Sequence, residues 1–155
     1  MLETNRVMNV TALTTPEKIV PLHYADCLKI ADRIPEGATV ADIGCGGGFP
    51  TLPLAMVRPD LTIVGIDSTD KKVRYVQRTA ETLGLSDVRT VAARAEELAH
   101  DPSFRESFDV VISRAVARLN VLDELCLPLV KVGGQFIAMK GAAGQAELEE
   151  AVYGM

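Results

Sequence analysis

A glycine-rich run at residues 42–48, with the sequence DIGCGGG, constrains this chain more than any other feature. It directly follows an apolar stretch at residues 38–41, and a second apolar stretch at residues 62–66 ends at Asp67. Glycines between a strand and a helix let the backbone turn tightly and approach a ligand closely. An acidic side chain at the tip of the next strand can accept hydrogen bonds from both hydroxyl groups of a ribose. The pairing therefore predicts a nucleoside-binding α/β domain.

The spacing of the glycines distinguishes between possible nucleoside ligands. After the first two glycines, the dinucleotide fingerprint requires a glycine at position 49, which is Phe49, and no Gly-Lys-Ser/Thr follows to make a P-loop. An acidic residue at the strand end would also repel a pyrophosphate, whereas S-adenosylmethionine carries a sulfonium and an ammonium and no phosphate. We therefore expect S-adenosylmethionine as the cofactor; the alternative is a turn that serves packing only. The expected loop contacts are Asp42, Gly44, Gly46 and Gly48.

The bulk composition indicates one domain. A chain of 155 residues that is 48% hydrophobic can bury about 70% of its unfolded surface. We expect a helical lead-in at residues 1–36 and a cofactor-binding core at residues 37–155. No signal peptide is recognisable, and no apolar run approaches the roughly 18 residues that a membrane span needs. A cytoplasmic protein without membrane contact is expected.

Cysteines and charges narrow the functional classes further. The three cysteines form no C-x-x-C pair and have no histidine cluster nearby, which argues against a disulfide framework or a metal site. A net charge of −5 gives no global attraction to nucleic acid, so an RNA partner would need a local basic surface. The alternative for the basic stretch at residues 71–78 is a solvated helix face. The residues that we expect to contact RNA are Lys71, Lys72, Arg74, Arg118 and Lys140.

Strand and helix patterns alternate along the chain. Apolar runs bounded by turn residues predict strands at residues 39–43, 61–66, 88–92, 108–113 and 135–139. Helices are predicted at residues 16–33, 51–57, 69–83 and 119–130, with Gly84 ending the third of them and a turn at 131–134. This alternation predicts a doubly wound (Rossmann-like) parallel sheet of order 3-2-1-4-5. Its switch point lies between the first and fourth strands and brings the glycine loop beside Ser113 and Arg114.

Several short motifs carry a resemblance to a known family. Together with the glycine run, the segments Gly48-Phe49-Pro50, Ser113-Arg114-Ala115 and Met139-Lys140-Gly141 resemble the ribosomal RNA small subunit methyltransferase G family of class I methyltransferases. The resemblance covers nearly the whole chain and implies methylation of guanine N7 in 16S ribosomal RNA of the small ribosomal subunit. It also implies a cofactor-binding set that joins the loop residues above with Phe49, Asp67, Ser68, Ala95, Glu96 and Arg114.

The chain also departs from that family. Thr51 stands where the family usually has glycine, and Cys27 replaces a common serine. Family members usually carry a further helical segment before this sequence, and they continue past the fifth strand with a helix and an antiparallel hairpin. We therefore expect a shortened form that lacks the C-terminal hairpin, so that the apolar strand at 136–139 is an uncovered edge open to self-association.

The implied chemistry needs no general base. Guanine N7 has an available lone pair and no proton to lose, so positioning supplies most of the catalysis, on the order of 7–11 kcal/mol. The predicted catalytic residue, Arg114, would donate to guanine O6 or to the RNA backbone; the alternative is a salt bridge that anchors a loop. Two other functions stay open: methylation of a different substrate, and a catalytically silent scaffold that binds the cofactor.

Overall fold

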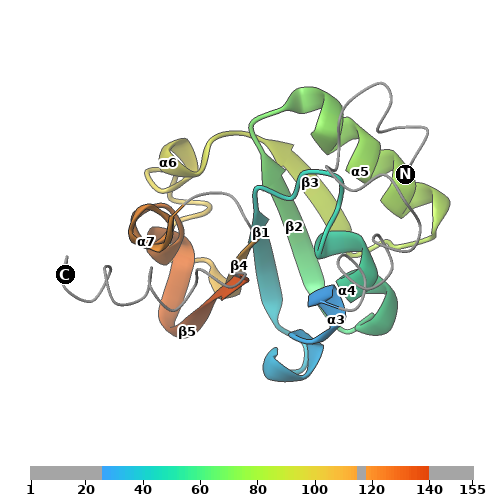
Figure 1. Ribbon diagram of the computed structural model, residues 1–155, viewed down its shortest axis with the longest axis horizontal. Coiled ribbons are helices and arrows are strands. Elements are labelled where there is room, and N and C mark those ends of the chain that lie inside the picture. The colour runs from blue at the N-terminus through green and yellow to red at the C-terminus, as the bar shows by residue number, and fades with distance from the viewer. Residues whose placement is uncertain (1–25, 115–117, 140–155) are drawn as a thin grey trace.

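The computed structural model describes residues 26–114 and 118–139, which fold around a five-stranded parallel sheet. The strand order is β3-β2-β1-β4-β5, as predicted from the sequence, with β1 at the centre (Figure 1). Predicted and observed strand bounds agree closely for the first four strands. The strands are β1 (Thr39–Ile43), β2 (Thr62–Asp67), β3 (Val88–Ala92), β4 (Phe108–Arg114) and β5 (Val130–Met139).

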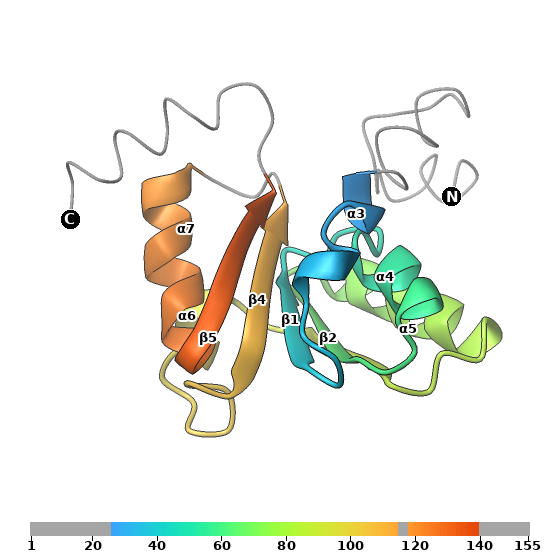
Figure 2. The same ribbon diagram turned by 90° about the horizontal axis from the view of Figure 1, so that it is seen from below.

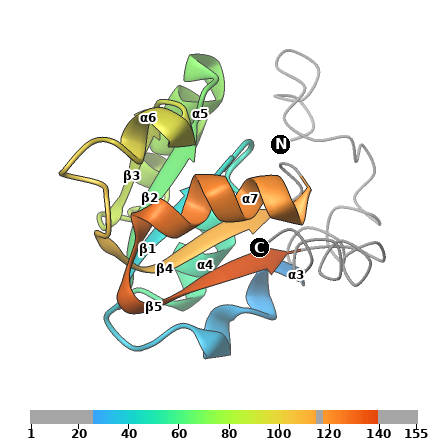
Figure 3. The ribbon, with the colours of Figure 1, turned by 90° about the vertical axis from the view of Figure 1, so that its left-hand side faces the viewer.

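Helices cover both faces of the sheet, as Figure 2 shows. On one face lie α3 (Asp26–Leu28), α4 (Thr51–Val57) and α5 (Asp70–Thr82). The other face carries α6 (Ala95–Leu98) and α7 (Leu119–Cys126), and α7 runs in front of β4 and β5 in Figure 3. Because both faces are covered, the central strands are apolar at consecutive positions. Val40 packs in the cluster beneath α4 and α5, while its neighbour Ala41 packs in the cluster beneath α6 and α7.

The helix α5 shows the expected amphipathic pattern. Val73, Val76 and Ala80 are buried against the sheet, and charged residues occupy the opposite face. Leu83 caps the helix, and the next residue is Gly84 with φ of +72°, the left-handed position predicted for it.

The fifth strand begins earlier than expected. The predicted helix at residues 119–130 ends at Cys126 and is followed by the 3-10 turn η3 (Leu127–Leu129), because Pro128 has no N–H to continue the helix. β5 then starts at Val130, and its register against β4 shifts between the partners of Phe108 and Val110. The predicted turn at residues 131–134 corresponds to this irregular, exposed stretch. Within the described residues β5 lies at one edge of the sheet and β3 at the other, and self-association through β5 stays a prediction.

The lead-in helix does not continue to Arg33 as predicted. Within the described residues, α3 ends at Leu28 and a separate 3-10 turn, η2, spans Ala31–Arg33. Arg58 explains this shape, because its Nη1 donates to the carbonyls of Ala31 at 2.6 Å and Ile34 at 3.0 Å. Its guanidinium also forms a two-point contact with Asp60, each bond 2.8 Å long. The end of the lead-in is therefore attached to the turn before β2.

Candidate functional site

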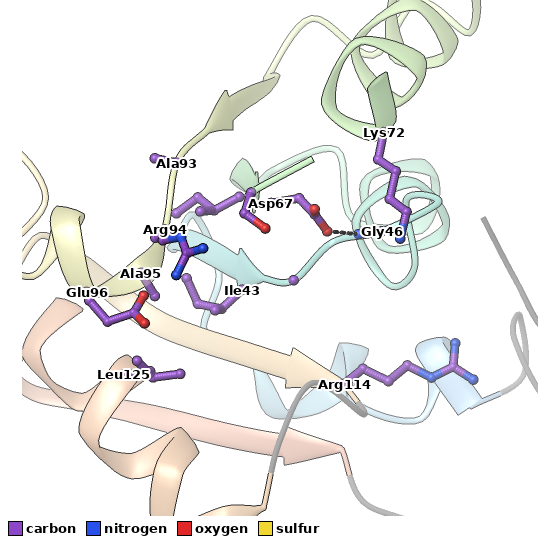
Figure 4. A pocket seen from close by; sticks show the side chains of 13 residues that line it. Ile43, Gly46, Asp67, Lys72, Ala93, Arg94, Ala95, Glu96, Arg114 and Leu125 are labelled. Carbon is purple, nitrogen blue, oxygen red and sulfur yellow. Dashed lines mark hydrogen bonds between the residues drawn. The ribbon is translucent and has the colours of Figure 1, made fainter. Parts of the chain in front are cut away.

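A cavity of about 470 Å³ opens at the carboxyl ends of β1, β2 and β4. It lies at the topological switch point between β1 and β4, where a doubly wound sheet places its ligand. Figure 4 shows side chains from separate parts of the chain converging there. The lining residues are Ile43, Gly44, Gly46, Ile66, Asp67, Ser68, Lys72, Ala93, Arg94, Ala95, Glu96, Arg114 and Leu125.

The glycine loop forms one wall of this cavity. Gly44 donates its N–H to the carbonyl of Ile66 at 2.7 Å, which attaches the loop to the end of β2. Gly44, Gly46 and Gly48 all have positive φ, at 74°, 50° and 96°. Residues other than glycine rarely adopt this backbone conformation, so the turn itself requires the glycines. The loop presents backbone rather than side chains to the cavity.

Asp67 joins the loop to the next strand. Its Oδ2 accepts a hydrogen bond from the N–H of Gly46 at 3.0 Å, drawn in Figure 4, and its Oδ1 accepts from Thr69 at 2.9 Å. A carboxylate can accept about four hydrogen bonds in total, so both oxygens retain acceptor capacity toward the cavity. The predicted ribose partner thus lies in the cavity beside the glycine loop.

The far end of the cavity combines apolar walls with charged rims. Ala95, which is 7% exposed, and the exposed Glu96 begin the short helix α6, and Leu125 of α7 faces them. An apolar slot with a carboxylate at its edge suits a heteroaromatic ring that carries an amino group. Arg94 also lines this end and was not predicted from the sequence.

Arg114 ends β4 and lies on the other side of the cavity, away from Glu96 (Figure 4). Its Nη1 donates to Sγ of Cys27 at 3.6 Å, and Cys27 is fully buried on α3. The preceding residue, Ser113, is buried and donates from Oγ to the carbonyl of Ile43 at 3.2 Å. The lead-in helix and the β1–β4 pairing therefore both fix the position of this arginine.

Asp42 lies beneath the loop and does not line the cavity. Its side chain is 1% exposed, and its Oδ2 accepts a 2.6 Å hydrogen bond from Oγ1 of the fully buried Thr51. Burial raises the pKa of Asp42 to about 7. The hydrogen bonds from Thr51 and the positive charge of Arg114 lower this pKa, whereas the negative charge of Asp67 raises it further. Position 51, noted as a departure in the sequence, is thus a direct partner of the glycine motif.

The remaining predicted site residues are spread over the surface and the core. Gly48 and Phe49 are buried outside the cavity lining. Among the predicted RNA contacts, Lys72 lines the cavity, while the exposed Arg74 forms a 2.8 Å ion pair with Asp70 one helical turn away. Arg118 is exposed at the start of α7.

Other predicted residues and site types can be placed more briefly. Lys71 is exposed on α5, and Lys140 lies outside the described residues. The functional roles of all these side chains stay predictions. Across residues 26–114 and 118–139, no group of three or more potential ligands gathers to hold a metal ion. Over the same part of the chain, no helix is long and apolar enough to cross a membrane.

Sequence reasoning missed the apolar walls of the cavity. Ile43, Ile66 and Ala93 lie at strand ends, and Leu125 belongs to a helix far along the chain. Nothing in the local pattern distinguishes these residues from ordinary core positions. The strand order could have identified the first three, because the last residues of adjacent parallel strands meet at one edge of a sheet.

Comparisons with known proteins agree with one another. A family model described as rRNA small subunit methyltransferase G (GidB) matches residues 1–153. Proteins named ribosomal RNA small subunit methyltransferase G match along almost the whole chain: that of Clostridium novyi is 44% identical over 94% of this chain and 60% of its own length. That of Bacillus cereus (strain B4264) is 43% identical over 100% of this chain and 66% of its own. The chain thus spans 60–66% of the length of these curated relatives.

Solved structures share the fold. A S-adenosylmethionine-dependent methyltransferase from Aquifex aeolicus aligns with a TM-score of 0.65 and 23% identity, over 92% of this chain and 86% of its own. A ribosomal protein L11 methylase from Lactobacillus delbrueckii subsp. bulgaricus aligns with a TM-score of 0.65 and 18% identity, over 83% of this chain and 65% of its own. At these identities the likeness concerns the architecture of the sheet and its helices.

Proposed function

The chain belongs to the ribosomal RNA small subunit methyltransferase G family, and from this premise we propose that its cavity binds S-adenosylmethionine. We propose further that the methyl group goes to N7 of a guanine in 16S ribosomal RNA, on the small ribosomal subunit in the cytoplasm. The observation that carries the first step is the contact of Asp67 with the N–H of Gly46 at the mouth of a cavity of about 470 Å³. Binding sites for small molecules and cofactors usually have volumes of roughly 300–1,000 Å³, and this cavity lies within that range.

The lining residues fit the parts of that cofactor. Asp67 would accept hydrogen bonds from the ribose hydroxyls, and Ser68 lies next to it. Ala95 and Leu125 would flank the adenine, with the carboxylate of Glu96 near its amino group. The loop that contains Gly44 would lie against the methionine part, because its backbone allows close approach. The bound cofactor would supply an electrophilic methyl group on a positively charged sulfur.

Arg114 is the candidate for orienting the target base. Guanine N7 carries a lone pair and no proton, so no side chain in the cavity has to act as a base. Arg114 lines the cavity, and its contact with Cys27 connects it to the lead-in helix; from this position its guanidinium would donate to guanine O6 or to a phosphate. A donor aimed at O6 positions N7 at the same edge of the base, which is the contribution that this reaction requires.

RNA would be bound outside the cavity by exposed basic side chains. Lys71 and Arg118 follow the carboxyl ends of β2 and β4, on the side of the sheet where the cavity opens. With a net charge of −5, the chain lacks a general attraction for RNA, so such local contacts would have to supply it. The target base is reached most easily in a single-stranded loop, where it is already unstacked.

The test is transfer of a radiolabelled methyl group to small ribosomal subunits from a strain that lacks this enzyme, followed by nucleoside mapping. We expect label on N7 of one guanine, and its loss in Arg114→Ala with the fold retained. The exposed Arg89→Ala, near the start of β3 and at the end of the sheet away from the cavity, is a matched control that should transfer normally. Label on another molecule would favour a different substrate. Cofactor binding without transfer to any acceptor would favour a silent scaffold.

A further inference from the structure

We propose that Thr51 keeps Asp42 charged beneath the glycine loop, and that this buried charge makes the cavity prefer the cationic methyl donor over the neutral product of transfer. The inference rests on the proposed function, since it concerns the same cofactor. It assigns a specificity-determining role to Thr51, a residue that lies outside the cavity lining. It also makes Asp42 act through its electric field, without touching the ligand.

The geometry ties the two side chains together under the loop. Thr51 is the first residue of α4 and is fully buried, and its Oγ1 lies 2.6 Å from Oδ2 of Asp42. A methyl group on Gly65, the partner of Asp42 in β2, would lie 3.5 Å from the same Oγ1 and 3.2 Å from Sγ of Cys45. The pair is therefore closely surrounded by Gly65 and Cys45 and excluded from solvent.

Asp42 retains an unused acceptor. Among the described residues, its Oδ1 is the one buried side-chain oxygen or nitrogen that has no hydrogen-bond partner. Asp42 immediately precedes Ile43 and Gly44, which both line the cavity. A charge at this position lies next to the residues that line the cavity, and water cannot screen it well because the side chain is 1% exposed.

Groups from the surrounding elements determine how readily the carboxyl of Asp42 ionises. Desolvation opposes ionisation, and so does the negative charge of Asp67 at the end of β2. The hydroxyl and the backbone N–H of Thr51 at the start of α4, together with the charge of Arg114 at the end of β4, favour ionisation. Burial raises the pKa of the adjacent Cys45 thiol, so this thiol adds no charge. Removal of one hydrogen bond can therefore decide whether Asp42 is charged near neutral pH.

The reaction itself changes the charge that Asp42 would sense. Transfer breaks the bond between sulfur and the methyl carbon, leaves the electron pair on sulfur, and forms the bond between that carbon and guanine N7. The donor has a net charge of +1 and the thioether product has none. An anion under the loop therefore stabilises the bound donor and contributes little to the bound product, which is a difference in affinity and hence specificity.

Thr51 supplies a hydrogen-bond donor that a smaller residue at this position would lack. The sequence resemblance marks position 51 as usually glycine, and glycine has no hydroxyl to donate. A backbone N–H at that position could still contact Asp42, but the 2.6 Å bond from Oγ1 would be absent. The threonine is then the group that sets how readily the buried carboxyl ionises.

The experiment measures dissociation constants of S-adenosylmethionine and S-adenosylhomocysteine by calorimetry between about pH 6 and pH 8. The wild-type preference for the donor should rise with pH. In Thr51→Val the preference at pH 7 should fall about tenfold and recover only at higher pH, because the carboxyl loses a donor. Thr51→Ser keeps the hydroxyl and should behave as wild type. Asp42→Asn should show a low preference that does not change with pH.

Three results would overturn the inference. One is an unchanged preference in Thr51→Val and Asp42→Asn, with near-ultraviolet circular dichroism showing both folded. The second is an equal loss of affinity for both ligands in Thr51→Val, which would indicate that the hydroxyl only shapes the loop. The third is a wild-type preference that does not vary with pH. Failure of the wild-type chain to bind either ligand is distinct, because it would overturn the proposed function and this inference with it.

Discussion

Gly48 satisfies two requirements for glycine, a positive φ and a lack of space for a Cβ, and comparison with Gly37 separates them. Its φ is +96°, and a Cβ there would lie 2.6 Å from Cδ1 of Leu52. Gly37 has a similar φ of +69°, but a Cβ on it would meet nothing within 4 Å. Gly48→Ala should therefore lower the free energy of unfolding by about 1–3 kcal/mol more than Gly37→Ala does, because overpacking adds to backbone strain. Urea unfolding of the two variants measures this, and equal losses would contradict the packing requirement.

Asp42 should make stability depend on pH. An unfolded aspartate ionises near pH 3.8, whereas burial raises the folded pKa to about 7. Between these values the folded state binds more protons than the unfolded state, so stability falls as pH rises and levels off above about pH 7. Asp42→Asn removes this dependence. Urea unfolding at about pH 5 and pH 8 should show the variant gaining about 3 kcal/mol over wild type at the higher pH; a difference independent of pH would contradict it.

The position of Asp42 also shows how far residue-level prediction reaches. The acidic residue in the glycine motif was expected to contact the cofactor because of its charge. In a strand covered on both faces, however, alternate side chains point to opposite sides, and Asp42 follows Ala41 and shares the α4 side with Val40. The alternation of side chains along the strand therefore predicts that this carboxyl lies on the α4 side of the sheet, where Thr51 begins the helix. By contrast, Asp67 and Gly46 are predictable because the motif spacing itself brings them together.

Among the elements, η2 and the residues after it are attached to the turn before β2 by Arg58 and Asp60. The guanidinium of Arg58 contacts the carbonyls of Ala31, Ile34 and Pro35, and Asp60 in turn accepts from the N–H of Gly37 at 2.9 Å. These contacts keep the pKa of Asp60 well below its usual range, with the Arg58 hydrogen bonds as the largest cause. A lysine ammonium group lacks the planar set of N–H donors that a guanidinium has, so it cannot make all of these hydrogen bonds.

Arg58→Lys should consequently loosen residues 31–37 while leaving the sheet intact. We expect faster amide hydrogen exchange at Gly37 and Ile34, and a melting temperature lower by a few degrees. The exposed Arg78→Lys on α5 should change neither quantity. Exchange in residues 31–37 that matches wild type would show that the packing of Ile34 and the hydrogen bond from Gln135 to the carbonyl of Arg33 hold this segment without Arg58.

Element boundaries illustrate which features the sequence can specify. Apolar runs and turn residues are local, so β1, α4 and β3 have the predicted bounds. The short helix α6 was not expected, because four residues are too few to show a helical period. The early start of β5 depends on its pairing with β4 and on Gly134, where a Cβ would lie 2.7 Å from the carbonyl of Asp109. Such contacts between distant segments leave no local pattern.

At the scale of the whole molecule, the proposed RNA surface makes a prediction about salt. Arg118→Ala should weaken binding of a 16S ribosomal RNA fragment and reduce the slope of log affinity against log salt by about 1, since one phosphate contact is lost. Lys131 lies near the start of β5, at the end of the sheet away from the cavity, and forms a 3.3 Å ion pair with Asp109. Lys131→Ala is therefore the control that should bind RNA normally. Equal effects of both substitutions would indicate a general charge effect instead of a surface at the cavity side.

The fold, the family and the contact of Asp67 with the N–H of Gly46 all favour the binding of a cationic nucleoside by the glycine loop and Asp67. Titration calorimetry with S-adenosylmethionine and, separately, with the dinucleotide NAD⁺ is the sharpest test of which ligand the cavity binds. We expect saturable binding of S-adenosylmethionine, weakened about 10- to 100-fold in Asp67→Asn through loss of charge-assisted bonds to the ribose. We expect no binding of NAD⁺. Binding of NAD⁺ without binding of S-adenosylmethionine would show that the cavity is a dinucleotide site instead.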